Sequence, residues 1–268
     1  MLKKLYKHEF YSLLRSLLPI YAALIGFAAL SRLSFLIEIE NKVFSIVRGL
    51  STTVYVFAII AVFIVGLVIV VMRFYKNLLS HEGYLTFTLP FTATKHIVCK
   101  LICGTIVMII DFILVICSLL ILGAGTETLS EIFEVLRQSF GVLTDYVTTG
   151  QIIAVATELA VLILISPIQS LLMFYAAISL GQQFKNKVGG AVVAYICLYA
   201  AVQILSTVIM MPVSFATAGG IDEFDSMINN SVGYLQIFLL VMILYSAVLS
   251  AAYFFISRHC LTKKLNLE

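Results

Sequence analysis

The sequence predicts an all-α integral membrane protein with six transmembrane helices, an N-terminal amphipathic elbow helix and both termini in the cytoplasm. Of its 268 residues, 62% are hydrophobic and only 12% are charged, and the mean hydropathy is +1.09. A soluble domain carries about a quarter charged residues. Six apolar windows each reach the roughly 20 residues that a helix needs to cross the bilayer. They cover residues 17–37, 50–72, 97–122, 152–180, 190–211 and 234–256.

The distribution of basic residues predicts the orientation in the cell membrane. Segments 1–16, 73–100, 181–189 and 257–268 hold most of the 17 Lys and Arg residues, whereas 38–49, 123–151 and 212–233 hold few. Cytoplasmic loops are the ones enriched in Lys and Arg. We therefore expect a multi-pass protein, N-in and C-in, in which residues 1–268 form a single transmembrane domain. Segments 123–151 and 212–233 are then external loops.

The first seventeen residues, MLKKLYKHEFYSLLRSL, have the pattern of an interfacial helix. At 100° per residue the apolar side chains fall in one arc and the polar ones lie opposite. Such a helix lies at the cytoplasmic surface, with its basic face toward lipid phosphates. We predict this elbow helix over residues 1–16, with membrane lipid as its partner. The apolar arc is Leu2, Tyr6, Phe10, Leu13 and Leu17; the opposite side is Lys4, His8, Ser12 and Arg15.

The sequence offers no catalytic chemistry at membrane depth. All four histidines fall in segments predicted to be cytoplasmic, and neither HExxH nor GxxxxGK[ST] occurs. Cys99 and Cys103 share a helix face, but no further metal ligand accompanies them, so we interpret them as small buried hydrophobic residues. We predict no catalytic residue, no metal site, no cofactor on this chain and no nucleic-acid partner.

Three ionisable residues lie inside the predicted spans, where such groups are costly and therefore candidates for function. Arg32 and Glu158 are both about 9 Å from the outer ends of their spans at 1.5 Å per residue, so we predict that they pair. Asp111 lies near mid-membrane without an evident basic partner. Two interpretations of Asp111 stay open: a protonated group hydrogen-bonded to a neighbouring helix, or the lining of a polar cavity.

The segment RFYKNLLSHEGYLTFTLPFTATKH, residues 73–96, is far longer than a turn between two helices requires. It places Leu85, Phe87 and Leu89 beyond the bilayer, and exposed apolar clusters of this kind usually mark a docking site for a partner. The alternative is that the segment folds back into the interface as an aromatic belt, with Tyr84 at headgroup level.

Within this segment, Glu82-Gly83-Tyr84-Leu85, Leu89-Pro90-Phe91 and then Lys100 follow in order. This series resembles the first cytoplasmic loop of ABC-2 type permeases, the membrane subunits of ABC exporters. The resemblance extends to the whole chain, because the family also has an elbow helix, six spans and a short external helix before span six, here IDEFDSMINN at 221–230. Tyr84 stands where the family has a small residue. Segment 123–151 is longer than in the family and carries apolar residues at helical spacing.

The resemblance implies a membrane-spanning subunit of an ATP-driven exporter of an amphipathic, lipid-like or peptide cargo. Its partners would be ABC ATPase subunits, which bind ATP and Mg, and a second permease copy in a homodimer or heterodimer. Two alternatives remain: a secondary transporter or channel that uses Asp111 and Glu158, and a non-transporting accessory protein. The residues implied to couple the chain to the ATPase are Glu82, Gly83, Tyr84, Leu85, Phe87, Leu89 and Pro90.

Overall fold

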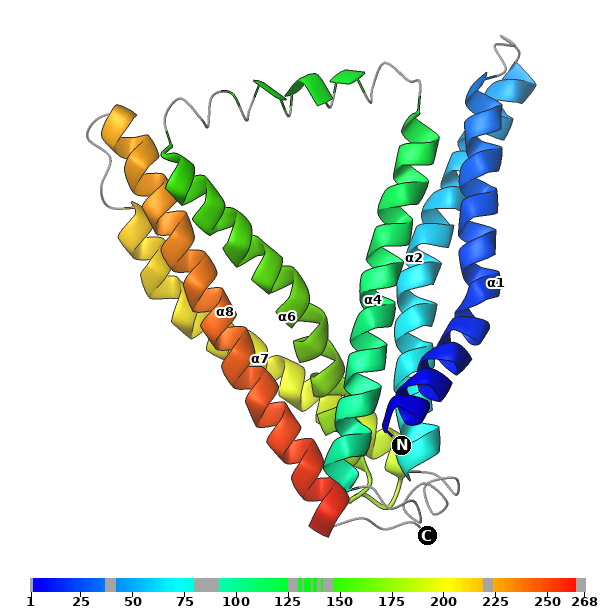
Figure 1. Ribbon diagram of the computed structural model, residues 1–268, viewed down its shortest axis with the longest axis vertical. Helices are drawn as coiled ribbons and strands as arrows, with labels where there is room; N and C mark the ends of the chain where they lie inside the picture. The colour runs from blue at the N-terminus through cyan, green and yellow to red at the C-terminus, as the bar shows by residue number, and fades with distance from the viewer. Residues whose placement is uncertain are drawn as a thin grey trace. The chain divides into compact units, whose positions relative to one another are not determined.

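The computed structural model describes residues 2–36, 42–79, 92–124, 147–218 and 224–263, together with residues 130, 131, 133–135, 137, 138 and 141. The long described ranges form six helices (Figure 1). These are α1 (Leu2–Leu36), α2 (Lys42–Leu79), α4 (Ala93–Gly123), α6 (Thr149–Gly181), α7 (Lys187–Ala218) and α8 (Phe224–Lys263). The described residues between 130 and 141 are also helical.

Each of the six helices contains one of the predicted apolar windows and is long and apolar enough to cross a membrane. Even the shortest, with 31 residues, measures about 47 Å at 1.5 Å per residue, which exceeds the hydrocarbon thickness of about 30 Å. The predicted all-helical, multi-pass membrane protein is therefore confirmed. The orientation of the termini stays a prediction.

The helices extend further than the apolar windows indicated. The segment 212–233, predicted as an external loop, is helical as far as Ala218 and again from Phe224. Residues 224–230, predicted as part of a short separate helix, belong to α8 instead. The physical reason is that hydropathy detects only the part of a helix that meets lipid, whereas backbone hydrogen bonding continues into polar sequence.

The first helix is continuous from Leu2 to Leu36, so its N-terminal part leads into the first span without a break, and the predicted position of this part at the membrane surface stays a prediction. Its N-terminal part nevertheless runs at an angle to the remainder (Figure 1). Pro19 lies inside the helix and lacks the backbone N–H that would bond to the preceding turn, which is a common cause of bending. On the side predicted to be polar, Lys4, His8 and Arg15 are exposed, whereas Ser12 is half-buried.

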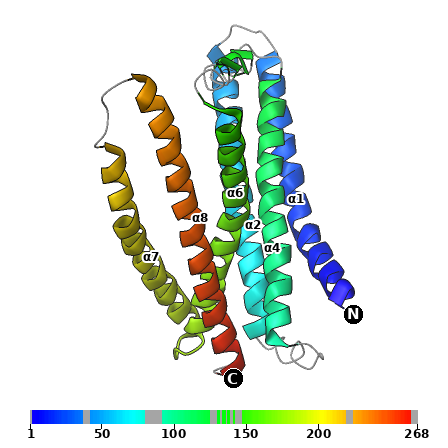
Figure 2. The ribbon, with the colours of Figure 1, turned by 60° about the vertical axis from the view of Figure 1, so that its left-hand side comes forward.

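The chain forms two compact units, which we describe separately. The first comprises residues 1–76 and 95–134 and contains α1 and all but a few end residues of α2 and α4, and these three helices lie side by side in both views (Figures 1 and 2). Its core residues repeat every three to four positions along α1, and Tyr55 and Val62 of α2 and Val107 of α4 pack there too. The buried stripe of α1 is Leu13, Leu17, Tyr21, Leu24, Ala28 and Ser31.

The second unit comprises residues 77–94 and 135–268 and contains α6, α7 and α8. In this unit α6 packs against both other helices. At the turn into α7, a side chain on Gly181 would overlap the backbone of Ala191, so only glycine permits this close approach. Phe174 stacks on Tyr195 with ring centroids 4.6 Å apart. A close approach at glycine and aromatic stacking thus join α6 to α7.

Candidate functional site

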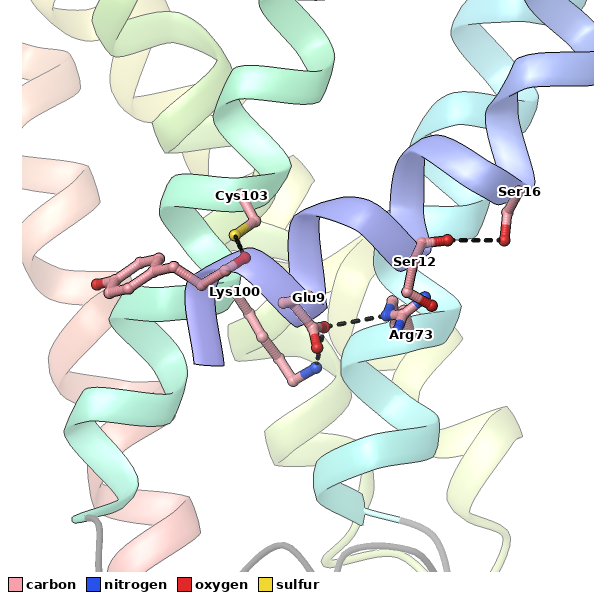
Figure 3. Close-up of polar contacts among 7 residues, drawn as sticks. Glu9, Ser12, Ser16, Arg73, Lys100 and Cys103 are labelled. Carbon is pink, nitrogen blue, oxygen red and sulfur yellow. Dashed lines mark hydrogen bonds and ion pairs between the residues drawn. The ribbon is translucent and has the colours of Figure 1, made fainter. Parts of the chain in front are cut away.

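A cluster of three charged side chains joins all three helices of the first unit. The Lys100 ammonium lies 2.6 Å from Glu9 Oε1, and Arg73 Nε lies 3.1 Å from the same oxygen (Figure 3). Glu9 comes from α1, Arg73 from the last two turns of α2 and Lys100 from the second turn of α4. The side chains of Glu9 and Lys100 are only 9% and 7% exposed, whereas that of Arg73 is 20% exposed. The charges of Glu9 and Lys100 are therefore shielded from water and depend on one another.

The local sequence explains why an acidic residue occupies this position. Glu9 precedes Leu13 by four residues and Leu17 by eight, so it lies on the buried stripe of α1. The surrounding polar positions of the same helix are basic and exposed. Glu9 is thus an acid on the packed face of a basic helix, and it accepts hydrogen bonds from cations on two other helices. The cluster carries two positive charges against one negative charge.

The cysteines of α4 lie next to this cluster. Cys103 Sγ approaches the Tyr6 carbonyl at 3.9 Å, as drawn in Figure 3. Cys99 and Cys103 are both buried, free thiols. Among the described residues, no three His, Cys, Asp or Glu side chains gather closely enough to hold a metal ion. Their position fits the interpretation that they pack as small apolar side chains.

Asp111 occupies the interior of the same three-helix unit. The Tyr21 hydroxyl of α1 donates a hydrogen bond to Asp111 Oδ1 at 2.5 Å, and the carboxyl is fully buried. On the α2 side, a methyl group at Gly66 would overlap Asp111 Oδ2. Of the two interpretations left open by the sequence, this geometry favours a group bonded to a neighbouring helix. The bond and the close approach together place α1 and α2 against α4.

The other two ionisable residues inside the spans lie in different units. Arg32 is half-buried on α1 in the first unit, and Glu158 is half-buried on α6 in the second. Glu158 Oε2 has no hydrogen-bond partner among the described residues. The ion pair between Arg32 and Glu158 stays a prediction.

The residues implied to contact an ATPase lie outside the described residues: Glu82, Gly83, Tyr84, Leu85, Phe87, Leu89 and Pro90. What the structure does describe is how the helices on either side of them are held. Arg73 lies seven residues before residue 80, and Lys100 lies nine residues after residue 91. Both are bonded to the same carboxylate of α1. The two helices that lead into and out of the segment are therefore joined close to its two ends.

Sequence reasoning named Lys100 but missed its partner Glu9 and the second cation of the cluster, Arg73. The signal for Glu9 was present, since a lone acid beside the apolar arc of an otherwise basic helix needs a cation. The partner of Asp111 was missed because only a basic partner was sought, whereas the donor is the Tyr21 hydroxyl, 90 residues away in the sequence. Comparison with models of known protein families, with curated proteins and with solved structures finds no match.

Proposed function

We propose that the chain is the membrane-spanning subunit of an ATP-driven transporter of the ABC-2 permease type, located in the cell membrane with both termini inside. Its cargo would be amphipathic, lipid-like or peptidic, and the direction would be export. Six membrane-length apolar helices support the proposal, as does the order of Glu82-Gly83-Tyr84-Leu85, Pro90 and Lys100 along the chain. ATP and Mg would be bound and ATP hydrolysed by a separate ATPase subunit.

The observation that carries the proposal is the ion cluster around Glu9. A segment that receives a push from an ATPase must pass the displacement to the membrane helices rather than bend one of them. Because Glu9 binds Arg73 before the segment and Lys100 after it, a displacement of residues 80–91 acts on α1, α2 and α4 together. An element with fixed internal contacts is what mechanical coupling requires.

The residues that would contact the ATPase would have different roles. Leu85, Phe87 and Leu89 would enter an apolar groove of the ATPase and contribute most of the interface energy. Glu82 would pair with a cation at the rim of that groove, while Gly83 and Pro90 would set the direction of the chain at the two ends of the segment.

A second permease copy would complete the transport path. Gln203 lies midway along α7 with an exposed side chain, in a helix that is otherwise strongly apolar. An amide facing lipid has no hydrogen-bond partner, whereas across a two-fold axis it can pair with the same amide of another copy. This feature supports association of two chains through α7.

A single substitution tests the coupling assignment. Leu85→Asp should leave membrane insertion intact but abolish co-purification of the ATPase and the permease-dependent change in its rate of ATP hydrolysis. Phe184→Asp is the matched control, because Phe184 is a large apolar residue, 53% exposed, in the turn between α6 and α7 that is predicted to be cytoplasmic. Equal loss in both variants, or loss in neither, would remove the coupling role of residues 82–90.

The same preparation separates the alternatives. A secondary transporter or channel would move cargo without any ATPase and would lose activity on Asp111→Asn. An accessory protein would bind the ATPase without flux of cargo. The hydrogen bond from Tyr21 and the contact with Gly66 give Asp111 a packing role, which favours the ATP-driven subunit over an ion carrier.

A further inference from the structure

The arginine near the end of α2 has hydrogen-bond donors that its ion pair does not use. Arg73 binds Glu9 Oε1 through Nε, and among the described residues this is its only hydrogen bond or ion pair. The same oxygen accepts a shorter bond from Lys100, at 2.6 Å against 3.1 Å, so Glu9 neutralises Arg73 only in part. The Arg73 side chain is 20% exposed. Its two terminal nitrogens therefore remain for an anion.

Two further polar groups lie one helical turn from this ion pair. Ser12 is three residues after Glu9 on α1, and Lys76 is three residues after Arg73 on α2, a spacing that makes them neighbours on the helix surface. Figure 3 shows Ser12 on the α1 turn next to the bond between Glu9 and Arg73. The bond between Ser12 and Ser16 uses the Ser12 carbonyl. Within the part of the chain that the structure describes, the half-buried Ser12 hydroxyl and the exposed Lys76 ammonium make no hydrogen bond or ion pair.

These groups lie at the boundary between hydrocarbon and headgroups. Arg73 directly follows the uncharged stretch of α2 at residues 50–72, and basic side chains at such a boundary lie among the lipid phosphates. On the membrane side of Arg73, Met72 and Val68 are 54% and 41% exposed. Val68 is about 7.5 Å deeper than Arg73 at 1.5 Å per residue. An anionic headgroup at Arg73 would thus continue into an exposed apolar surface.

We propose that Arg73, Ser12 and Lys76 form a binding site for the phosphate of a phospholipid. The terminal nitrogens of Arg73 give the phosphate two parallel bonds, the Ser12 hydroxyl gives one more, and Lys76 adds positive charge. One acyl chain lies along Val68 and Met72. Because Nε is already bonded to Glu9, the guanidinium is held in place and binding costs little further conformational entropy. The site does not depend on the proposed transport function.

Photolabelling of the full chain in nanodiscs tests the proposal. The probes are phosphatidylglycerol with a photoreactive diazirine in one acyl chain and diacylglycerol with the same chain. We expect labelling of residues 68–76 to be about tenfold stronger for the phospholipid, which corresponds to one charge-assisted hydrogen bond. Equal labelling by both lipids would overturn the proposal. Displacement of the phospholipid by inorganic phosphate, but not by chloride at the same ionic strength, would show a site for free phosphate and overturn the assignment to lipid.

The same substitution at two arginines separates this site from general attraction of lipid to a basic surface. Arg73→Lys keeps a cation for Glu9 but removes the two terminal nitrogens, so the preference for the phospholipid should be lost while the thermal unfolding midpoint stays near wild type. Arg15→Lys is the matched control, since Arg15 is an exposed arginine on another side of α1, and it should keep the preference. An equal preference in both variants would overturn the proposal.

A pair of serine variants tests the site without changing a charge. Ser12→Ala should reduce the preference for the phospholipid severalfold, because one donor to the phosphate is removed. Ser16→Ala is the matched control, since the Ser16 hydroxyl donates to the Ser12 carbonyl on the same helix, and it should leave the preference unchanged. A wild-type preference in Ser12→Ala would overturn the three-residue site.

Discussion

The two three-helix units of this protein differ in how many polar side chains join their helices. In the first, polar side chains connect α1, α2 and α4 at successive levels along the helices. In the second, the contacts of α6 with α7 include a close approach at Gly181 and the stacking of Phe174 on Tyr195, and the Tyr245 hydroxyl of α8 donates to the Val202 carbonyl of α7. In lipid, the apolar side chains of neighbouring helices gain little from leaving their solvent, so directional polar bonds and close packing have to supply cohesion and register.

The polar contacts of the first unit occur one after another along its antiparallel helices. The charged cluster at Glu9 comes first, and the bond between Tyr21 and Asp111 follows. Next, the Tyr55 hydroxyl lies 2.8 Å from that of Ser118, which itself donates to a backbone carbonyl, so Tyr55 is the donor. The helix ends at Ser34 and Arg48 form the last level. This arrangement fixes the register of three helices and makes the first unit the part suited to transmit a displacement.

The largest expected effect comes from removing the acid shared by two cations. Glu9→Ala leaves Lys100 as a buried charge without its carboxylate and removes the partner of the half-buried Arg73, and breaking a buried pair costs about 3–5 kcal/mol of unfolding free energy. Thermal unfolding in detergent, followed by loss of helical circular dichroism, should show a clearly lower midpoint. Glu131→Ala, at an exposed acid outside the helix bundle, is the control and should not change it. An unchanged midpoint in Glu9→Ala would show that the cluster does not hold the unit.

A smaller loss of unfolding free energy is expected from a substitution at Gly66, which faces Asp111. Gly66→Ala places a methyl group against the carboxyl, and overpacking of this kind costs about 1–3 kcal/mol. Gly26→Ala, where the space is open, should cost nothing. The double variant Gly66→Ala with Asp111→Ala should recover most of the loss, since the overlapping group is gone. Additive losses in the double variant would contradict the contact.

The smallest loss of unfolding free energy is expected from removing one hydrogen bond made by a tyrosine hydroxyl. Tyr55→Phe removes one bond in the first unit, and Tyr245→Phe removes the bond from Tyr245 to the Val202 carbonyl in the second. Hydrogen bonds between membrane helices average about 0.6 kcal/mol, so both variants should unfold close to wild type. A loss above about 2 kcal/mol for Tyr55→Phe alone would exceed the largest values for such bonds and would sharpen the contrast between the units.

The six membrane helices could be predicted because each depends on one contiguous apolar stretch. Their ends could not, since helical hydrogen bonding continues past the apolar residues, as in α7 up to Ala218. The contacts of the charged cluster could not be predicted from the sequence, for a different reason. Glu9 and Lys100 are 91 residues apart, and nothing local specifies which cation of a basic chain approaches which acid. Asp111 could be identified as unusual, but its donor Tyr21, 90 residues away, could not.

The measurement that tests the central claim most directly is ATP hydrolysis by the ATPase that we propose as partner, co-purified with the chain and compared among Glu9→Lys, Lys100→Glu and the charge-swapped double variant. We predict that each single variant keeps the ATPase bound but loses the permease-dependent change in hydrolysis, and that the double variant recovers much of it. Wild-type coupling in both single variants would contradict the role of the ion pair. Absence of any ATPase from the wild-type preparation would contradict the proposed function itself.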